Sequence, residues 1–164
     1  MIPLIIQDDF LKKEQFEFLK ENFKHKFMVE NILLTAAIYK LYKHRLTLKK
    51  LVDNPRCEHS DIPQSCFWNI HLVTLVPGRE KGKHRDAEWK LLSSILYVSD
   101  EGGGTIFIDE EGEHQIEWKP NRLVSFIPSE DSWHRYENML NTERRTVNFN
   151  YGNKISVEKN EEQR

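Results

Sequence analysis

The stretch FWNIHLVTLVPGREKGKHRDAEWKLLSSILYV, residues 67–98, decides the fold, because two apolar runs flank a short segment crowded with charge. The runs HLVTLV and LLSSILYV are typical of buried strands, and the PG pair at 77–78 marks a turn. The charged segment places His84 and Asp86 two residues apart, where the chain leaves its first strand. This pair gains a chemical meaning only if the rest of the chain supplies partners for it.

Strand signals continue at close spacing after residue 98. Residues 104–109, 114–118, 122–127 and 144–151 each have strand composition and are separated by turn-forming residues rich in Gly, Pro, Asp and Ser. Short strands spaced this regularly predict a sandwich or a jelly-roll barrel.

Two helical patterns and a short strand at residues 2–6 precede these strands. Apolar residues recur at helical spacing in residues 10–23 and again in residues 29–52, where an Asn-Pro pair ends the pattern. The prediction is therefore an α+β chain with a mainly β core, in which the N-terminal helices pack on one sheet. We expect a single domain over 1–164, with helical support at about 8–53, the jelly-roll core at about 67–152 and a flexible tail at about 153–164.

Composition narrows the class of protein. The 164 residues carry a formal net charge of −2, which gives no electrostatic argument for nucleic acid or for an anionic membrane. The two cysteines, Cys57 and Cys66, are too few for a disulfide framework. The start MIPLIIQDDF has no basic leader, and acidic residues interrupt its apolar run, so we expect a cytoplasmic protein without a membrane span.

His84 and Asp86 point the same way if the segment is extended, and His134 offers a third ligand further along the chain. Two histidines and one carboxylate on one face of a metal leave the opposite face open. That arrangement suits non-haem Fe(II), which must bind a bidentate co-substrate and O2 together.

An arginine follows His134 by about ten residues. A 2-oxo acid that chelates iron has a distal carboxylate, and a guanidinium neutralises it through two parallel hydrogen bonds. Arg144 and Arg145 are both candidates. Alternation places Arg144 on the polar face of the last strand, together with Thr146, and places Arg145 on the apolar face, which favours Arg144.

Residues 72–151 resemble the Fe(II)/2-oxoglutarate-dependent dioxygenases, specifically the prolyl 4-hydroxylase-like branch with its double-stranded β-helix. The resemblance is carried by VPG and HRD at 76–78 and 84–86, SSILYVSD at 93–100, GGT at 103–105, WH at 133–134 and RRTVNFNY at 144–151. Residues 25–66 resemble no family. Lys81 departs from the pattern, because the family usually carries an aromatic residue there.

The resemblance implies specific roles. His84, Asp86 and His134 would hold Fe(II), Arg144 would bind the distal carboxylate of 2-oxoglutarate, and Tyr97 and Thr146 would assist it. The implied co-substrates are 2-oxoglutarate and O2, with ascorbate as an additional cofactor. The implied activity is hydroxylation of an unactivated C–H bond in a protein or peptide, of the kind that prolyl hydroxylases perform.

Other readings stay open at this point. A non-catalytic, cupin-like metal-binding β-barrel or partner-binding module is the alternative, and a small polar substrate is compatible with the charged loops. The five remaining histidines, which include His71 and His114, are interpreted as surface or packing residues rather than ligands. Trp89 and Trp133 flank the motif segments and are candidates for the mouth of a pocket.

Overall fold

The computed structural model describes residue 2, residues 4–25 and residues 66–153. This part of the chain is mainly β, as predicted. Its elements, in order, are β1 (Leu4–Gln7), α1 (Lys13–Glu21), β2 (Cys66–Leu75), β3 (Arg79–His84), β4 (Lys90–Tyr97), β5 (Ile106–Asp109), β6 (Gly112–Gln115), β7 (Leu123–Phe126), β8 (Trp133–Asn138) and β9 (Arg144–Asn153).

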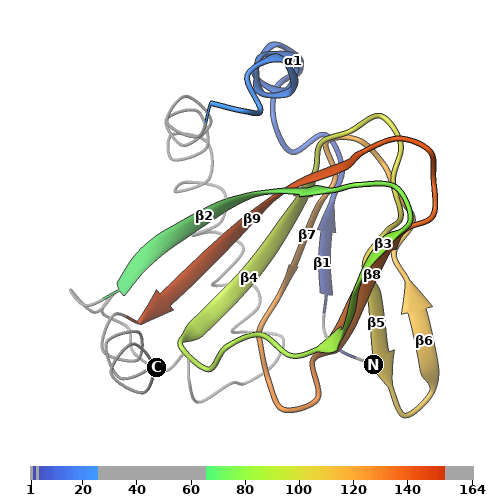
Figure 1. Cartoon of the computed structure of the whole chain (residues 1–164). Helices are drawn as coiled ribbons and strands as arrows, with labels where there is room; N and C mark the ends of the chain where they lie inside the picture. The colour runs from blue at the N-terminus through green and yellow to red at the C-terminus, as the bar shows by residue number, and fades with distance from the viewer. Residues whose placement is uncertain (1, 3, 26–65, 154–164) are drawn as a thin grey trace, which may run out of the picture.

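The strands form two antiparallel sheets that face one another (Figure 1). One sheet has five strands in the order β1-β7-β4-β9-β2, and the other has four in the order β3-β8-β5-β6. From β2 onward, successive strands alternate between the sheets except at the β5–β6 hairpin, so β4 and β9 lie side by side although they are far apart in sequence. This alternation places the ends of β3, β8 and β9 around one space.

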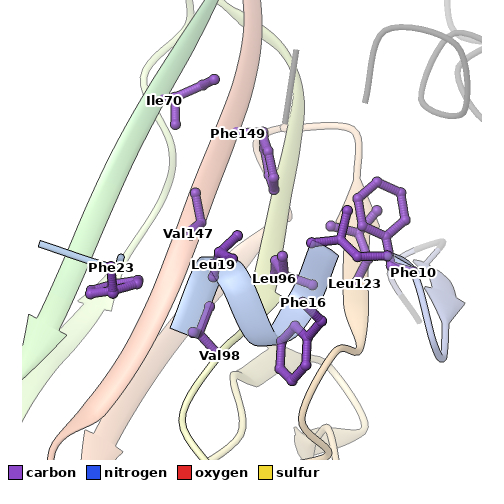
Figure 2. Packing of buried hydrophobic residues seen from close by; sticks show 11 residues of the cluster. Phe10, Phe16, Leu19, Phe23, Ile70, Leu96, Val98, Leu123, Val147 and Phe149 are labelled. Atoms are coloured by element: carbon purple, nitrogen blue, oxygen red, sulfur yellow. The ribbon is translucent and has the colours of Figure 1, made fainter. Parts of the chain in front are cut away.

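The five-stranded sheet is covered on one face by α1. Leu19 is fully buried and lies in a cluster with Leu96 and Val98 from β4 and the residue that follows it, and with Val147 and Phe149 from β9 (Figure 2). These strand residues are separated by two along the chain, so they share one face of the sheet. The helix therefore contributes an apolar stripe to the core.

The other face of the same sheet packs against the four-stranded sheet. Tyr97, Val124 and Phe126 of the five-stranded sheet form a cluster with Phe107 of β5. The rings of Phe107 and Phe126 meet edge to face at 5.1 Å. Because both faces of β4 are covered, it reads in the sequence as a continuous apolar run.

The segment that leads into α1 is fixed by Asn121, in the turn before β7. Its side-chain oxygen accepts a hydrogen bond from the Leu11 N–H, and its amide nitrogen donates one to the Leu11 carbonyl, both at 2.9 Å. Asn121 has a φ of 63°, a left-handed conformation that asparagine tolerates better than most residues.

Two strands differ from the sequence prediction. Residues 79–84 were expected to be a charged loop, but they form β3, whose side chains are largely exposed. His134 falls outside the predicted strands, but it is the second residue of β8. Both strands lack the apolar alternation that identifies a half-buried strand, because β3 is charged and largely exposed and β8 consists mainly of polar residues, such as the ion pair Arg135–Glu137.

The second predicted helix, at about 29–52, falls outside the described residues, and so does almost all of the predicted tail, since β9 continues to Asn153. The one helix of the described part spans nine residues, too few to cross a membrane.

Candidate active site

His84 and His134 meet between the two sheets. They are register partners on the antiparallel strands β3 and β8, and their ring centroids are 4.4 Å apart. His134 is 3% exposed, and its ring packs edge to face on Phe126 at 5.2 Å. Direct strand pairing therefore brings together two residues that are fifty positions apart in the sequence.

Each of these rings is oriented by a backbone carbonyl. The Nδ1 atom of His84 lies 2.8 Å from the Gly82 carbonyl oxygen, and that of His134 lies 3.0 Å from the Ser132 carbonyl oxygen. A carbonyl only accepts hydrogen bonds, so Nδ1 is the donor in each ring and Nε2 of the neutral ring presents a lone pair. This is the outer-shell arrangement that fixes histidine ligands of metals. Burial lowers the pKa of His134 and favours that neutral form.

Asp86 follows β3 in the loop to β4, and both of its oxygens are engaged. Lys90 donates to Oδ1 and Ser93 donates to Oδ2, each at 2.5 Å. Burial opposes the negative charge, but Lys90 and Ser93 outweigh it and hold the pKa of Asp86 below its usual value. Asp86 is therefore an ionised, fixed carboxylate beside the two histidines.

The ligand atoms of the three predicted metal ligands lie further apart than those of another cluster of potential ligands. In the described part of the chain, one set of three His, Cys, Asp or Glu side chains has ligand atoms within 4.8 Å of one another, and it consists of Asp109, Glu111 and His114 on the β5–β6 hairpin. His114 Nε2 and Asp109 Oδ1 are 2.9 Å apart there. The sequence analysis missed this cluster, because it assigned His114 to packing or solvent contact.

Arg144, the first residue of β9, is buried and has no acidic partner among the described residues. The residue is 1% exposed, and its Nε donates to the Gly103 carbonyl at 2.7 Å. Its Nη2 atom is buried and has no hydrogen-bond partner among the described residues. Burial lowers the pKa of Arg144, and no described Asp or Glu forms an ion pair with it. A buried guanidinium with one unsatisfied edge is suited to receive a carboxylate.

Three aromatic rings surround this guanidinium. Its central carbon lies 4.5 Å from the ring centroid of Tyr136, 5.3 Å from that of Trp118 and 5.9 Å from that of Tyr97. The rings of Tyr97 and Trp118 stack at 4.3 Å with an interplanar angle of 7°. Tyr97 was predicted from the sequence to assist Arg144, whereas Tyr136 and Trp118 were not predicted. Tyr136 lies in β8 and Trp118 in the segment that follows β6, and their sequence context does not distinguish them from ordinary core aromatic residues.

The other predicted co-substrate residues lie next to this cation. Tyr97 and Thr146 are register partners on β4 and β9 and therefore share a face of the sheet. The Tyr97 hydroxyl accepts a hydrogen bond from the Thr105 N–H at 2.9 Å, and Thr146 donates to Asn148 at 3.3 Å. The hydroxyl oxygen of Thr105 is buried and has no hydrogen-bond partner in the described part. Thr105 was part of the family motif, but no feature of the sequence assigned it a role.

Arg145 points away from Arg144 and its aromatic neighbours. Its guanidinium carbon lies 5.9 Å from the Phe23 ring, on the side of the sheet that α1 covers, and it faces Glu143 at 3.9 Å. The alternation of side chains along β9 therefore places the two arginines on opposite faces of the sheet, which agrees with the preference for Arg144 stated from the sequence.

A pocket of about 490 Å³ opens beside His84 and Asp86. It is lined by residues 83–88 of β3 and the following loop, by residues 128–130, and by Trp133. The Trp133 ring lies 5.1 Å from the Lys83 ammonium and 4.8 Å from the Arg85 guanidinium. His84 and Asp86 are on the wall of this pocket, so a molecule bound in it would reach the candidate ligands.

Neither the models of protein families nor the curated proteins include a match to the sequence. Solved structures do match. A prolyl-4-hydroxylase from Pseudomonas putida superposes with a TM-score of 0.68 at 16% identity, over 93% of this chain and 89% of that one. The chain has the fold of the prolyl 4-hydroxylases. The resemblance stated from the sequence motifs is confirmed at that level.

Two further prolyl hydroxylases extend the comparison. The viral collagen prolyl hydroxylase of Paramecium bursaria Chlorella virus-1, solved as a 2OG complex, gives a TM-score of 0.68 at 12% identity over 92% of this chain and 95% of that one. A prolyl hydroxylase from Trichoplax adhaerens, solved with a hypoxia inducible factor peptide fragment, gives 0.71 at 10% identity over 93% and 84%. At these identities the similarity establishes the fold and leaves the chemistry to be argued from the residues.

Proposed function

We propose that this protein is an Fe(II)- and 2-oxoglutarate-dependent dioxygenase that hydroxylates an unactivated C–H bond. The observation that carries the proposal is the buried Arg144, which has an unsatisfied Nη2 and no acidic partner in the described part of the chain. Burying a lone charge is costly unless a partner arrives to neutralise it. The distal carboxylate of 2-oxoglutarate is such a partner.

The residues present also fit an iron ion. His84 and His134 present Nε2 lone pairs from rings that backbone carbonyls hold in place, and Asp86 supplies a carboxylate that stays ionised. Two imidazoles and one carboxylate are a donor set suited to non-haem Fe(II). When bound, the iron would supply the activation of O2 that protein side chains do not provide.

The chain's own residues perform the binding steps in this mechanism. Arg144 neutralises the distal carboxylate, while the rings of Tyr97, Trp118 and Tyr136 exclude water and strengthen that interaction. The Tyr97 and Thr105 hydroxyls border the same space. The carbonyls of Gly82 and Ser132 hold the imidazole protons on Nδ1, so both Nε2 atoms stay available.

We further propose that the two sheets form a double-stranded β-helix, because the strands from β3 to β9 alternate between them except at the β5–β6 hairpin. The pocket beside His84 would receive a protein or peptide, as in the relative solved with a peptide fragment. A prolyl-hydroxylase-like activity in the cytoplasm, with ascorbate as an additional cofactor and with residues 1–164 as one domain, completes this proposal.

The test is turnover of 2-oxoglutarate to succinate by the purified protein with Fe(II) and O2. We expect His84→Ala and Asp86→Ala to reduce the rate at least about 100-fold, because each removes an iron ligand. His114→Ala, which disrupts the cluster on the β5–β6 hairpin, is the matched control and should keep the rate. Near-normal turnover by either ligand variant would show that the ligand assignment is wrong.

A further inference from the structure

Lys90, the first residue of β4, forms a partly buried ion pair with a proposed iron ligand. Its Nζ lies 2.5 Å from Asp86 Oδ1, and the exposed fractions of the Lys90 and Asp86 side chains are 16% and 11%. The ammonium also lies 5.7 Å from the centroid of the Trp89 ring. The pair is held in a fixed place rather than in bulk solvent.

The positive charge of Lys90 is not required merely to orient the Asp86 carboxylate. Ser93 already donates to the other oxygen of Asp86 from a site that is 2% exposed, so a neutral hydroxyl orients the carboxylate. Lys90 adds a full positive charge next to the place where a divalent cation would bind. Its charge acts on His134 as well as on Asp86. Repulsion between cations is weakly screened where water is largely excluded.

The contacts of the Asp86 carboxylate agree with competition between Lys90 and a metal ion for its oxygen. The ligand atoms of His84, Asp86 and His134 do not all lie within 4.8 Å of one another, unlike those of the hairpin cluster in the described part. Asp86 instead directs one oxygen to Lys90 and the other to Ser93. A metal ion that binds an Asp86 oxygen must therefore share that oxygen with the Lys90 or Ser93 donor, or displace that donor.

We propose that Lys90 is an internal counter-ion that competes with the metal for Asp86 and so weakens the binding of divalent cations at this site. This inference rests on the proposed function, because it takes His84, Asp86 and His134 as the metal ligands. It implies that Lys90 raises the concentration of free metal at which the site is half occupied, so that loading responds to metal supply.

The test is titration of the purified protein with Co²⁺, followed by calorimetry and by the visible absorption of the bound ion, in the absence of 2-oxoglutarate. Lys90→Met removes the charge and the donor, whereas Lys90→Gln removes the charge and keeps a donor, so at least one neutral variant should fold. Lys90→Arg keeps the charge. Lys20→Gln is the matched control, because Lys20 pairs with Asp100 at 2.6 Å on the surface, away from the histidines.

We expect the neutral variants to bind Co²⁺ at least about tenfold more tightly than the wild type, with Lys90→Arg and Lys20→Gln close to the wild type. If the wild type binds Co²⁺ and the neutral variants bind it equally or more weakly, Lys90 positions Asp86 and the inference is wrong, while the proposed function stands. If His134→Ala leaves the wild-type affinity unchanged, or no protein binds Co²⁺, the proposed metal centre fails and the inference fails with it.

Discussion

At the scale of single residues, burial of the Arg144 guanidinium destabilises the ligand-free protein, and the same guanidinium is suited to bind a carboxylate. Its guanidinium is buried among aromatic rings, and its one hydrogen bond to the described residues runs from Nε to the Gly103 carbonyl. Residues that are unfavourable for stability and lie in a pocket are frequently retained for binding. Arg144 is therefore the residue at which stability and function should change in opposite directions.

We expect Arg144→Met to raise the Kd for 2-oxoglutarate by about 100-fold, because the distal carboxylate loses its charged partner. The free energy of unfolding of the ligand-free variant should be unchanged or higher by up to about 2 kcal/mol, because a lone buried charge is removed. Calorimetric titration and urea denaturation measure the two quantities. Arg145→Met, on the opposite face of β9, is the control and should bind normally. A variant that keeps its affinity would contradict the role of Arg144.

Part of this residue-level description could be predicted from the sequence. The spacing of His84, Asp86, His134 and Arg144 identified the candidates, and alternation along the last strand favoured Arg144 over Arg145. Tyr136 and Lys90 could not be predicted, because their roles depend on cross-strand register and side-chain direction. Neither is encoded in local spacing.

At the scale of elements, the segment between β4 and β5 passes too close to its neighbours for any side chain. A Cβ atom at Gly104 would lie 1.6 Å from the Ile116 carbonyl oxygen, and one at Gly103 would lie 2.3 Å from the Glu137 carbonyl oxygen. The Gly103 carbonyl also accepts the hydrogen bond from Arg144. The close packing of this backbone segment therefore contributes both to the stability of the fold and to the position of the Arg144 guanidinium.

Gly104→Ala should lower the free energy of unfolding by about 3 kcal/mol, since a backbone carbonyl must move to admit the methyl group. Urea denaturation gives this value directly. Gly82→Ala is the matched control, because a Cβ there would meet no atom within 4 Å, and it should be close to the wild type. A near-neutral Gly104→Ala would show that the two segments are not packed as described.

Asp8 ties the loop after β1 to the turn before β7. Hydrogen bonds from Arg122 and Lys119 hold the pKa of Asp8 well below its usual value. A depressed pKa means that the pairing stabilises the fold above the unfolded-state pKa of about 4 and that this contribution is lost as the pH falls through the folded-state value.

Asp8→Asn should therefore be less stable than the wild type at pH 7, and the difference should shrink as the pH is lowered below about 4. Denaturant unfolding across this range measures it. Asp131→Asn, at an exposed position, is the control and should be as stable as the wild type at pH 7. A difference that is independent of pH would mean that the ion pairs of Asp8 do not contribute.

The edge strand β3 illustrates where sequence patterns fail at this scale. REKGKH has charged residues on both faces, and the structure still pairs it with β8. The register is irregular between Lys81 and His84, which allows residues three positions apart to occupy the same side. A prediction based on the two-residue period of a regular strand cannot anticipate such a bulge.

At the scale of the whole molecule, one five-stranded sheet supports both the core and the site. Its outer face packs on α1, and its inner face carries Tyr97, Thr146 and Arg144. The arrangement of the strands in two sheets followed from their spacing in the sequence. The long predicted helix at about 29–52 lies outside the described residues, so its place in this arrangement stays a prediction.

Leu19→Ala tests the packing of α1 on this sheet. Leu19 is fully buried, and we expect its truncation to lower the free energy of unfolding by about 3 kcal/mol. Phe18→Ala is the control, because the neighbouring Phe18 is 39% exposed and should tolerate the change within about 1 kcal/mol. Equal effects of the two substitutions would contradict the docking of the helix through Leu19.

The central claim is that one metal centre and one carboxylate pocket act together between the sheets. Its most direct test is anaerobic titration of the metal-free protein with Fe(II) and then with 2-oxoglutarate, monitored for the visible charge-transfer band of a chelated 2-oxo acid. The account predicts a band in the wild type and in His114→Ala, and no band in His134→Ala or Arg144→Met at the same concentrations. A wild type that binds iron without developing the band, or a band that survives in His134→Ala and disappears in His114→Ala, would contradict it.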